Sequence, residues 1–261
     1  MTENKFIEKF SLKNKVAVVT GGAGLIGKPV SIGLAQAGAK VYVADINKKI
    51  GKELEKQNKN MRWVEIDITD LNSIKKCINK IVKDDKKIDV WVNCAYPRTS
   101  DWPEKFEDVK YESWKKNVDM HMNGYFLCCQ QVAKQMKKQK NGSIINFSST
   151  YGIVAPDFSI YDGTNKTMPA AYSAIKGGII TFTKYLATYY AKYGIRANVI
   201  CPGGIYDKHP DVFVKKYSQK TPMGRMGKAE EIAGPVIFLA SDAASYVTGH
   251  VLVVDGGWTA W

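Results

Sequence analysis

The stretch VAVVTGGAGLIGKPVSIGLAQAGAKVYVADI, residues 16–46, decides the fold of this chain. It contains an apolar strand pattern, a glycine-rich turn, an amphipathic helix pattern and a second apolar strand that ends at Asp45. Gly22, Gly24 and Gly27 satisfy the pattern G-x-G-x-x-G between a strand and a helix, the context in which that pattern is informative. The stretch therefore predicts a strand–helix–strand unit whose turn approaches a pyrophosphate at the helix N-terminus.

Asp45 predicts which dinucleotide this unit binds. It lies 18 positions after Gly27 (45 − 27), where a carboxylate can accept hydrogen bonds from a ribose diol and repels a 2′-phosphate. NAD is therefore favoured over NADP, although Lys48 and Lys49 oppose that preference, and a simple turn residue is the structural alternative for position 45. The predicted cofactor contacts in this unit are Gly21, Gly22, Gly24, Leu25, Ile26, Gly27 and Asp45.

Strand-like runs alternate with helical patterns along the rest of the chain. Short strands separated by helices pair in parallel, so the sequence predicts an α/β Rossmann fold with a doubly wound, seven-stranded parallel sheet flanked by helices. No linker, repeat or low-complexity segment divides residues 1–261, which predicts a single domain. The seven runs are KVAVVT (15–20), KVYVAD (40–45), MRWVEID (61–67), IDVWVN (88–93), GSIINFSS (142–149), IRANVIC (195–201) and HVLVVDGG (250–257).

Composition excludes several classes of protein. With 261 residues and 45% hydrophobic content, the chain can bury a substantial core. It lacks a signal-peptide pattern, and no apolar run approaches about 20 residues, so we expect a cytoplasmic protein without membrane spans.

The net charge of +13 is spread over polar helix positions, which favours a solvated surface over a nucleic-acid-binding patch. Five cysteines without CxxC spacing and three scattered histidines predict reduced thiols and no metal site.

The segment AAYSAIKGG, residues 170–178, predicts a reactive pair. Tyr172 and Lys176 are four residues apart and so lie on one face of a helix. An ammonium about 4 Å from the phenol, at an effective dielectric constant of about 20, is worth roughly 4 kcal/mol, or about three pKa units. This would bring the pKa of Tyr172 from about 10 to near neutrality and make it a proton carrier. The structural alternative is a packing pair at an interface.

Five motifs in order resemble those of the short-chain dehydrogenase/reductase family in its compact form. They are TGGAGLIG (20–27), INFSSTYG (145–152), YSAIK (172–176), NVICPGGI (198–205) and TGHVLVVDGG (248–257). The resemblance implies a nicotinamide cofactor and hydride transfer at a carbinol carbon. It makes Tyr172 the proton carrier, Lys176 its electrostatic partner and a ribose ligand, and Ser149 a hydrogen-bond donor to the same substrate oxygen.

The resemblance also implies further contacts and an assembly. It implies a homo-oligomer, a dimer or tetramer, that pairs helices near residues 112–138 and 170–193. With Tyr172 and Lys176, the further cofactor contacts that it implies are Asp67, Ile68, Asn93, Ala95, Pro202, Gly203 and Ile205.

The chain departs from the family pattern at several places. The family's NNAG motif reads NCAY here, so that Cys94 and Tyr96 are unusual. His121 stands where the family has a proton-relay asparagine; we expect it either to join that relay, holding a water and titrating near working pH, or to be a buried structural residue. Asp207 replaces a threonine that would bind the nicotinamide amide.

Two long segments, 152–169 and 203–224, follow strands at the edge of the sheet that holds the ligand crevice, and they are polar. They predict a hydroxyl-rich substrate, a sugar or sugar phosphate. The NCAYPR segment and the first insertion also resemble bacterial flagellin-modification oxidoreductases, which are associated with nonulosonic-acid sugars. The candidate substrate residues are Tyr96, Arg98, Asn165, Lys166 and His209.

Two other functions stay open at this point. The turn TGGAGLIG is also similar to that of the longer, sugar-nucleotide-modifying branch, which suggests an epimerase or dehydratase, but 261 residues leave little room for the substrate domain of such enzymes. The basic charge leaves a cofactor-sensing regulator that binds nucleic acid as a third class.

Overall fold

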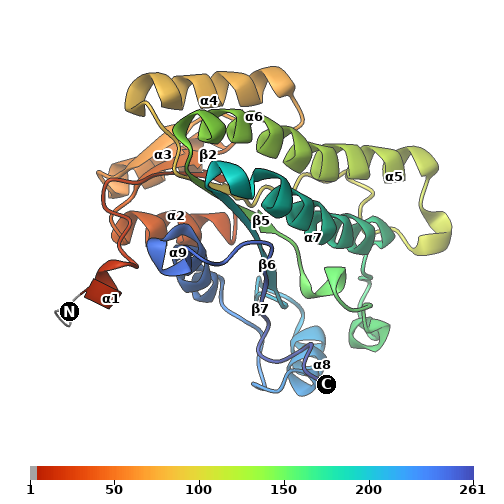
Figure 1. The fold of residues 1–261 in the computed structure, drawn as a ribbon. Coiled ribbons are helices and arrows are strands. Elements are labelled where there is room, and N and C mark those ends of the chain that lie inside the picture. The colour runs from red at the N-terminus through yellow and green to blue at the C-terminus, as the bar shows by residue number, and fades with distance from the viewer. Residues whose placement is uncertain (1–4) are drawn as a thin grey trace.

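A computed structural model, which describes residues 5–261, contains one sheet of seven parallel strands in the order β3-β2-β1-β4-β5-β6-β7 (Figure 1). The predicted doubly wound Rossmann fold is confirmed. Most strands are buried on both faces because helices cover both, which is why they read as continuous apolar runs. The strands are β1 (Val16–Thr20), β2 (Lys40–Ala44), β3 (Met61–Val64), β4 (Val90–Asn93), β5 (Gly142–Phe147), β6 (Ile195–Pro202) and β7 (Val251–Val254).

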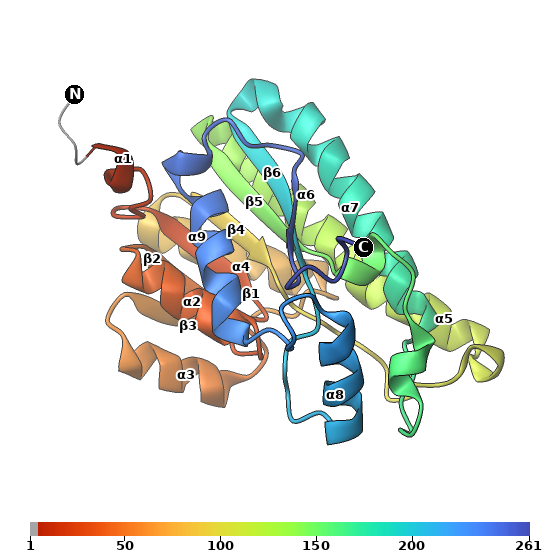
Figure 2. The same ribbon diagram turned by 90° about the horizontal axis from the view of Figure 1, so that it is seen from below.

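Helices lie on both faces of the sheet (Figures 1 and 2). Helices α2, α3 and α9 pack with one apolar cluster, and α4, α6 and α7 with another on the opposite face. None of the helices within residues 5–261 is long and apolar enough to cross a membrane. The helices are α1 (Lys5–Glu8), α2 (Gly27–Gln36), α3 (Lys48–Gln57), α4 (Leu71–Asp85), α5 (Tyr111–Val118), α6 (Gly124–Gln139), α7 (Ala170–Tyr190), α8 (Asp211–Lys220) and α9 (Ala233–Ala240).

The helical segment expected near residues 112–138 is one helical run over 111–139 whose winding changes in the middle. A π-helical turn, Asp119–Asn123, joins α5 to α6 and carries His121, which is fully buried. Such turns inside helices are frequent at functional sites because they redirect side chains. Here the turn brings the His121 ring to the side chain of Lys176 on α7.

The strand order reverses between β1 and β4, which are neighbours in the sheet. Open α/β sheets bind ligands at such a switch point, outside the carboxyl ends of the strands. Two connections extend beyond this edge: the loop 152–169 between β5 and α7, and the segment 203–210 that leads from β6 to α8. A third apolar cluster fills the space beneath them, with Tyr151, Ile160, Phe213, Tyr217, Met226 and Trp258.

Candidate active site

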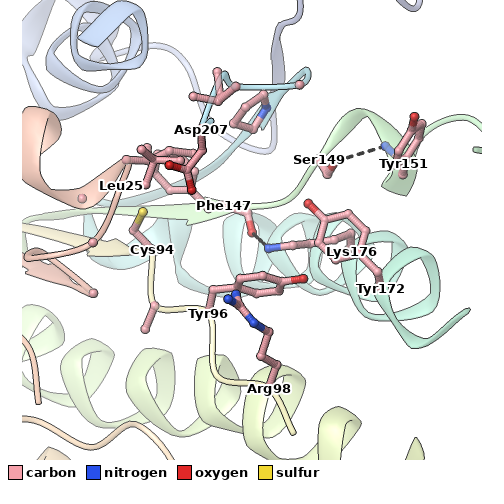
Figure 3. Close-up of a pocket in the computed structure, with 18 of the residues that line it drawn as sticks. Leu25, Cys94, Tyr96, Arg98, Phe147, Ser149, Tyr151, Tyr172, Lys176 and Asp207 are labelled. Atoms are coloured by element: carbon pink, nitrogen blue, oxygen red, sulfur yellow. Dashed lines mark hydrogen bonds between the residues drawn. The ribbon is translucent and has the colours of Figure 1, made fainter. Parts of the chain in front are cut away.

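A cavity of about 750 Å³ opens at this edge of the sheet. It extends from the glycine-rich turn before α2, past the ends of β4, β5 and β6, to the loops on the far side (Figure 3). The predicted cofactor residues that line it are Gly21, Gly24, Leu25, Ile26, Gly27, Asp45, Asp67, Ile68, Ala95, Tyr172, Lys176, Pro202, Gly203 and Ile205. The sequence therefore predicted most of one continuous site.

The backbone of the glycine-rich turn, which is expected to approach a pyrophosphate, is too closely packed for side chains at Gly21 and Gly27. Gly21 has a φ of +66°, and a Cβ there would lie 2.6 Å from the Cα of Ala95. A Cβ at Gly27 would overlap the carbonyl oxygen of Gly21 and lie 2.9 Å from the Cα of Gly22. Gly22 differs from the prediction: it packs against β1 and Ser31 and does not line the cavity. Its role is to form the turn.

The Asp45 carboxylate is held at the end of β2 by two backbone groups. Its Oδ2 accepts from the N–H of Ala23 at 2.9 Å, and its Oδ1 accepts from the N–H of Asn47 at 2.8 Å. Each carboxylate oxygen has a further lone pair, so the group can still accept from two ribose hydroxyls. The glycine turn and this oriented carboxylate together fit an adenosine dinucleotide.

Asn93 corrects the predicted cofactor set. Its side chain is fully buried and does not line the cavity. Its amide donates to Oδ1 of Asn146 at 2.8 Å and to Sγ of Cys129 at 3.3 Å, and its Oδ1 accepts from the indole of Trp91 at 2.8 Å. These bonds satisfy every polar atom of the side chain beneath the sheet edge, so Asn93 supports the site from below.

Lys176 lies at the centre of the cavity wall with 5% of its surface exposed. Its Nζ donates to the carbonyl oxygen of Phe147 at 2.9 Å and lies 3.3 Å from Nε2 of His121. The same nitrogen is 5.7 Å from the ring centre of Tyr96 and 5.6 Å from that of Tyr172. Aromatic faces stabilise a cation at such distances. Burial nevertheless lowers the pKa of Lys176 to about 8.

This buried amine makes stability depend on pH. Between about pH 8 and pH 10, Lys176 is neutral in the native chain but protonated in the unfolded chain, so native stability rises with pH. We expect the free energy of unfolding of the native protein, minus that of Lys176→Met, to become more positive by up to about 1.4 kcal/mol per pH unit in that window. Urea denaturation of both proteins at several pH values checks this; a constant difference would show that the amine keeps its ordinary pKa.

The pKa of Tyr172 differs from the value expected from the sequence. Tyr172 and Ser149 both line the cavity. Lys176 is one helical turn after Tyr172 on α7. Burial raises the pKa of Tyr172 above 10, and the Ser149 hydroxyl partly opposes this by hydrogen bonding. The expected lowering to near neutrality by Lys176 is therefore wrong for the chain by itself, since removing the phenolate from water outweighs the hydrogen bond from Ser149.

His121 lies behind Lys176 and does not line the cavity. Its Nε2 faces the amine, so the ring proton belongs on Nδ1, which has no hydrogen-bond partner within residues 5–261. Burial and the charge of Lys176 hold the pKa of His121 well below 6.5. The expected titration near working pH is wrong, because a buried imidazole beside an ammonium stays neutral.

The substrate half of the cavity contains four of the five predicted residues. Tyr96, Arg98, Lys166 and His209 line it, whereas Asn165 is exposed and outside the lining. Sequence reasoning missed several apolar and aromatic lining residues. They are Tyr151, Met168, Phe213, Tyr217 and Met226. The four-residue spacing of Phe213 and Tyr217 on α8 was the available signal, since it places both rings on one helix face.

Known proteins resemble this chain over nearly its whole length. The family model for enoyl-(acyl carrier protein) reductase matches residues 22–259. Post-translational flagellin modification protein A of Campylobacter coli is 36% identical over 253 residues, which are 95% of this chain and 99% of the relative. Sorbose reductase SOU1 of Candida albicans is 37% identical over 97% of this chain and 90% of the relative.

Two solved structures are also similar to this chain over nearly its whole length. A short-chain dehydrogenase from Leptospira borgpetersenii with bound NAD⁺ has a TM-score of 0.88 and 35% identity, covering 99% of this chain and 97% of that one. A gluconate 5-dehydrogenase from Burkholderia cenocepacia, in complex with NADP and tartrate, has a TM-score of 0.87 and 27% identity, covering 98% and 99%. Both phosphorylated and unphosphorylated cofactors thus occur among the similar structures.

Proposed function

The chain belongs to the short-chain dehydrogenase/reductase family, and from that premise we propose that it is an NAD-dependent oxidoreductase that acts on a sugar or sugar phosphate. The observation that carries the proposal is one continuous cavity with Ser149, Tyr172 and Lys176 on one wall and the glycine turn with Asp45 at one end. Such a cavity brings a proton carrier and a dinucleotide site to the same substrate.

Each residue has a separate role. A nicotinamide dinucleotide held by the glycine turn and Asp45 would supply the hydride chemistry. Tyr172 exchanges a proton with the substrate oxygen, and the Ser149 hydroxyl hydrogen-bonds that oxygen. Lys176 supplies the positive charge beside the phenol and can also bind the nicotinamide ribose. His121 acts through Lys176, whose amine it contacts at 3.3 Å, as a positioning residue.

The sugar assignment rests on the lining and on the relatives. Tyrosine rings with polar edges, such as Tyr96, Tyr151 and Tyr161, suit a ligand with both apolar faces and many hydroxyls. A sorbose reductase and a gluconate 5-dehydrogenase are among the similar proteins. The test follows absorbance of the reduced cofactor across free, phosphorylated and nucleotide-linked sugars. Absence of cofactor-linked turnover on the entire panel would contradict the proposed substrate class.

The NAD preference is assigned to Asp45. In Asp45→Asn the repulsion of a 2′-phosphate is lost, while the one side-chain oxygen can still accept from one of the two backbone N–H groups that now bond the carboxylate. We expect the ratio of kcat/KM for NAD⁺ to that for NADP⁺ to fall by about 10-fold or more, since one lost charge repulsion is worth at least about 1.4 kcal/mol. Steady-state kinetics with both cofactors measure it; an unchanged ratio would remove Asp45 from this role.

We also propose that copies of the chain associate through α6 and α7, as a dimer or tetramer. Phe126 on α6 and the stacked pair Tyr185 and Tyr189 on α7 are each between 43% and 58% exposed. Exposed aromatic side chains that gather in this way commonly mark association surfaces. A monomeric mass in light scattering would contradict this assembly.

A further inference from the structure

The charged residues of the cavity lining are unevenly distributed along it. Asp45 and Asp67 belong to the predicted cofactor end, beside the glycine turn. Arg98 and Lys166 belong to the segments predicted to hold the substrate. The substrate half of the described lining also contains Asp207, whose backbone N–H donates to Nδ1 of His209 at 3.1 Å. A positive balance therefore surrounds the place where the substrate extends away from Tyr172.

Arg98 presents a guanidinium with unused donors. Within residues 5–261, its side chain takes part in no ion pair and no hydrogen bond, whereas Arg225 is paired with Glu231 and Arg62 donates to backbone carbonyl oxygens. The group lies over the Tyr96 ring (Figure 3), and its central carbon is 5.0 Å from the ring centre. Stacking on a ring face leaves the N–H groups at the guanidinium edge free to donate. Such a pre-oriented fork matches the oxygens of a carboxylate or phosphate.

Tyr96 connects this guanidinium to the reactive residues. Its ring packs edge-on against Tyr172 with 5.8 Å between ring centres, and likewise against Trp102 at 5.8 Å. Lys176 lies on the same ring at 5.7 Å. One aromatic side chain thus separates Arg98 from the proton carrier. Arg98 and Tyr172 both line the cavity, so one substrate can contact both of them.

Lys166 is left without a carboxylate on the other side of the cavity. The acidic residues of its own loop are already paired with α8: Asp157 with Lys220, and Asp162 with Lys216 at 3.6 Å. No ion pair among the described residues includes Lys166. His209 is close enough for the charge of Lys166 to help lower its pKa. The loop therefore offers the cavity a free ammonium.

From these contacts we infer that the substrate carries a carboxylate or phosphate group, which Arg98 binds through the edge of its stacked guanidinium, with Lys166 as a second cation. This inference rests on the proposed function and makes its substrate class narrower. The oxidised form of the substrate is then an acidic ketone or aldehyde, and the reduced form the corresponding hydroxy acid or hydroxylated phosphate. A neutral sugar lacks the group that both cations would bind.

Binding of matched compounds tests the inference. The Tyr172→Phe protein with NAD⁺ bound is titrated calorimetrically, so that hydride transfer does not consume the ligand. D-Gluconate is compared with D-sorbitol, which differs at one end only, and D-glucose 6-phosphate with D-glucose. We expect at least one anionic member to bind about 10- to 100-fold more tightly than its neutral partner, the range that a charge-assisted hydrogen bond supplies. The two pairs distinguish a carboxylate from a phosphate.

Four variants in the same background assign the effect. Arg98→Gln should abolish most of the anionic preference, Arg98→Lys should keep part of it, and Lys166→Gln should reduce it less. Lys105→Gln is the matched control, because Lys105 lies in the same connection between β4 and α5, is exposed and does not line the cavity. It should keep the whole preference. Equal loss in Lys105→Gln would attribute the effect to overall charge and overturn the inference.

The inference and the proposed function fail in different ways. No preference for either anionic compound, including no binding at 10 mM, or a preference that survives Arg98→Gln, overturns the inference. The proposed function is then judged separately, by turnover of the native protein on the sugar panel. An Arg98-dependent preference without hydride transfer on any member of the panel would instead keep the anion site and contradict the proposed substrate class.

Discussion

Tyr172→Phe is expected to lower kcat by about 10²- to 10⁴-fold on any substrate that the native protein oxidises or reduces, the range typical for loss of a general acid or base. The phenylalanine ring keeps the packing of Tyr172 against Tyr96 and Trp102 and removes only the hydroxyl. Because the proton acceptor is lost while the cavity keeps its shape, KM should change much less than kcat. Absorbance of the reduced cofactor measures both constants.

The comparison variant for this experiment is His121→Asn. His121 contacts Lys176 but lies outside the cavity, and asparagine keeps an acceptor for the amine. We expect a smaller loss of kcat and a pH–rate profile displaced from the native one, since the surroundings of Lys176 change. Full activity of Tyr172→Phe would remove the phenol from proton transfer. An unchanged profile in His121→Asn would leave the histidine a structural residue.

Gly27→Ala is expected to abolish most binding of the dinucleotide. The added Cβ would overlap the carbonyl oxygen of Gly21 and lie 2.9 Å from the Cα of Gly22, so the turn itself must move. Backbone neighbours cannot rotate away as a flexible side chain can. Because the same turn approaches the pyrophosphate, we expect the Kd for NADH to rise by about 10-fold or more, corresponding to about 1.4 kcal/mol or more. Fluorescence titration with NADH measures this Kd.

The matched control is Gly234→Ala on α9, where a Cβ meets no atom within 4 Å. In a helix alanine is better than glycine by about 0.5–1 kcal/mol, so this protein should bind NADH normally and denature at an equal or slightly higher urea concentration. Circular dichroism of Gly27→Ala shows whether it still folds. Native affinity for NADH in a folded Gly27→Ala protein would mean that the dinucleotide does not bind at this turn.

The fold could be predicted because its signals are local and repeated. Each strand is a short apolar run, and the β1–α2–β2 unit contains its glycine turn in order. Tyr172 and Lys176 could be paired from helix geometry alone. Asn93 could not be placed correctly, because a strand-end position does not reveal which side of the sheet the side chain enters. Its partners Asn146 and Cys129 come from segments distant in the sequence.

The pKa values of the site residues were the least predictable property from the sequence. A distance and a dielectric constant gave the expected effect of Lys176 on Tyr172, but the burial of both groups depends on the assembled loops and strands. Desolvation raises the pKa of Tyr172, where a lowering was expected, and it keeps His121 neutral. Asn165 shows the same limit for geometry: its neighbour Lys166 lines the cavity, and it does not.

The ion pairs between the loop 152–169 and α8 have a consequence for the response of the cavity walls to salt. Lys216 and Lys220 on α8 form ion pairs with Asp162 and Asp157 of the loop, and these pairs connect two walls of the cavity. All four side chains are partly exposed. Exposed pairs contribute at most about 1 kcal/mol each and weaken in salt. Raising the ionic strength therefore weakens only the ion pairs of this connection, whereas the bonds from Lys216 to the carbonyl oxygens of Ser159 and Asp162 and the packing of Tyr161 against Phe213 keep the two walls together.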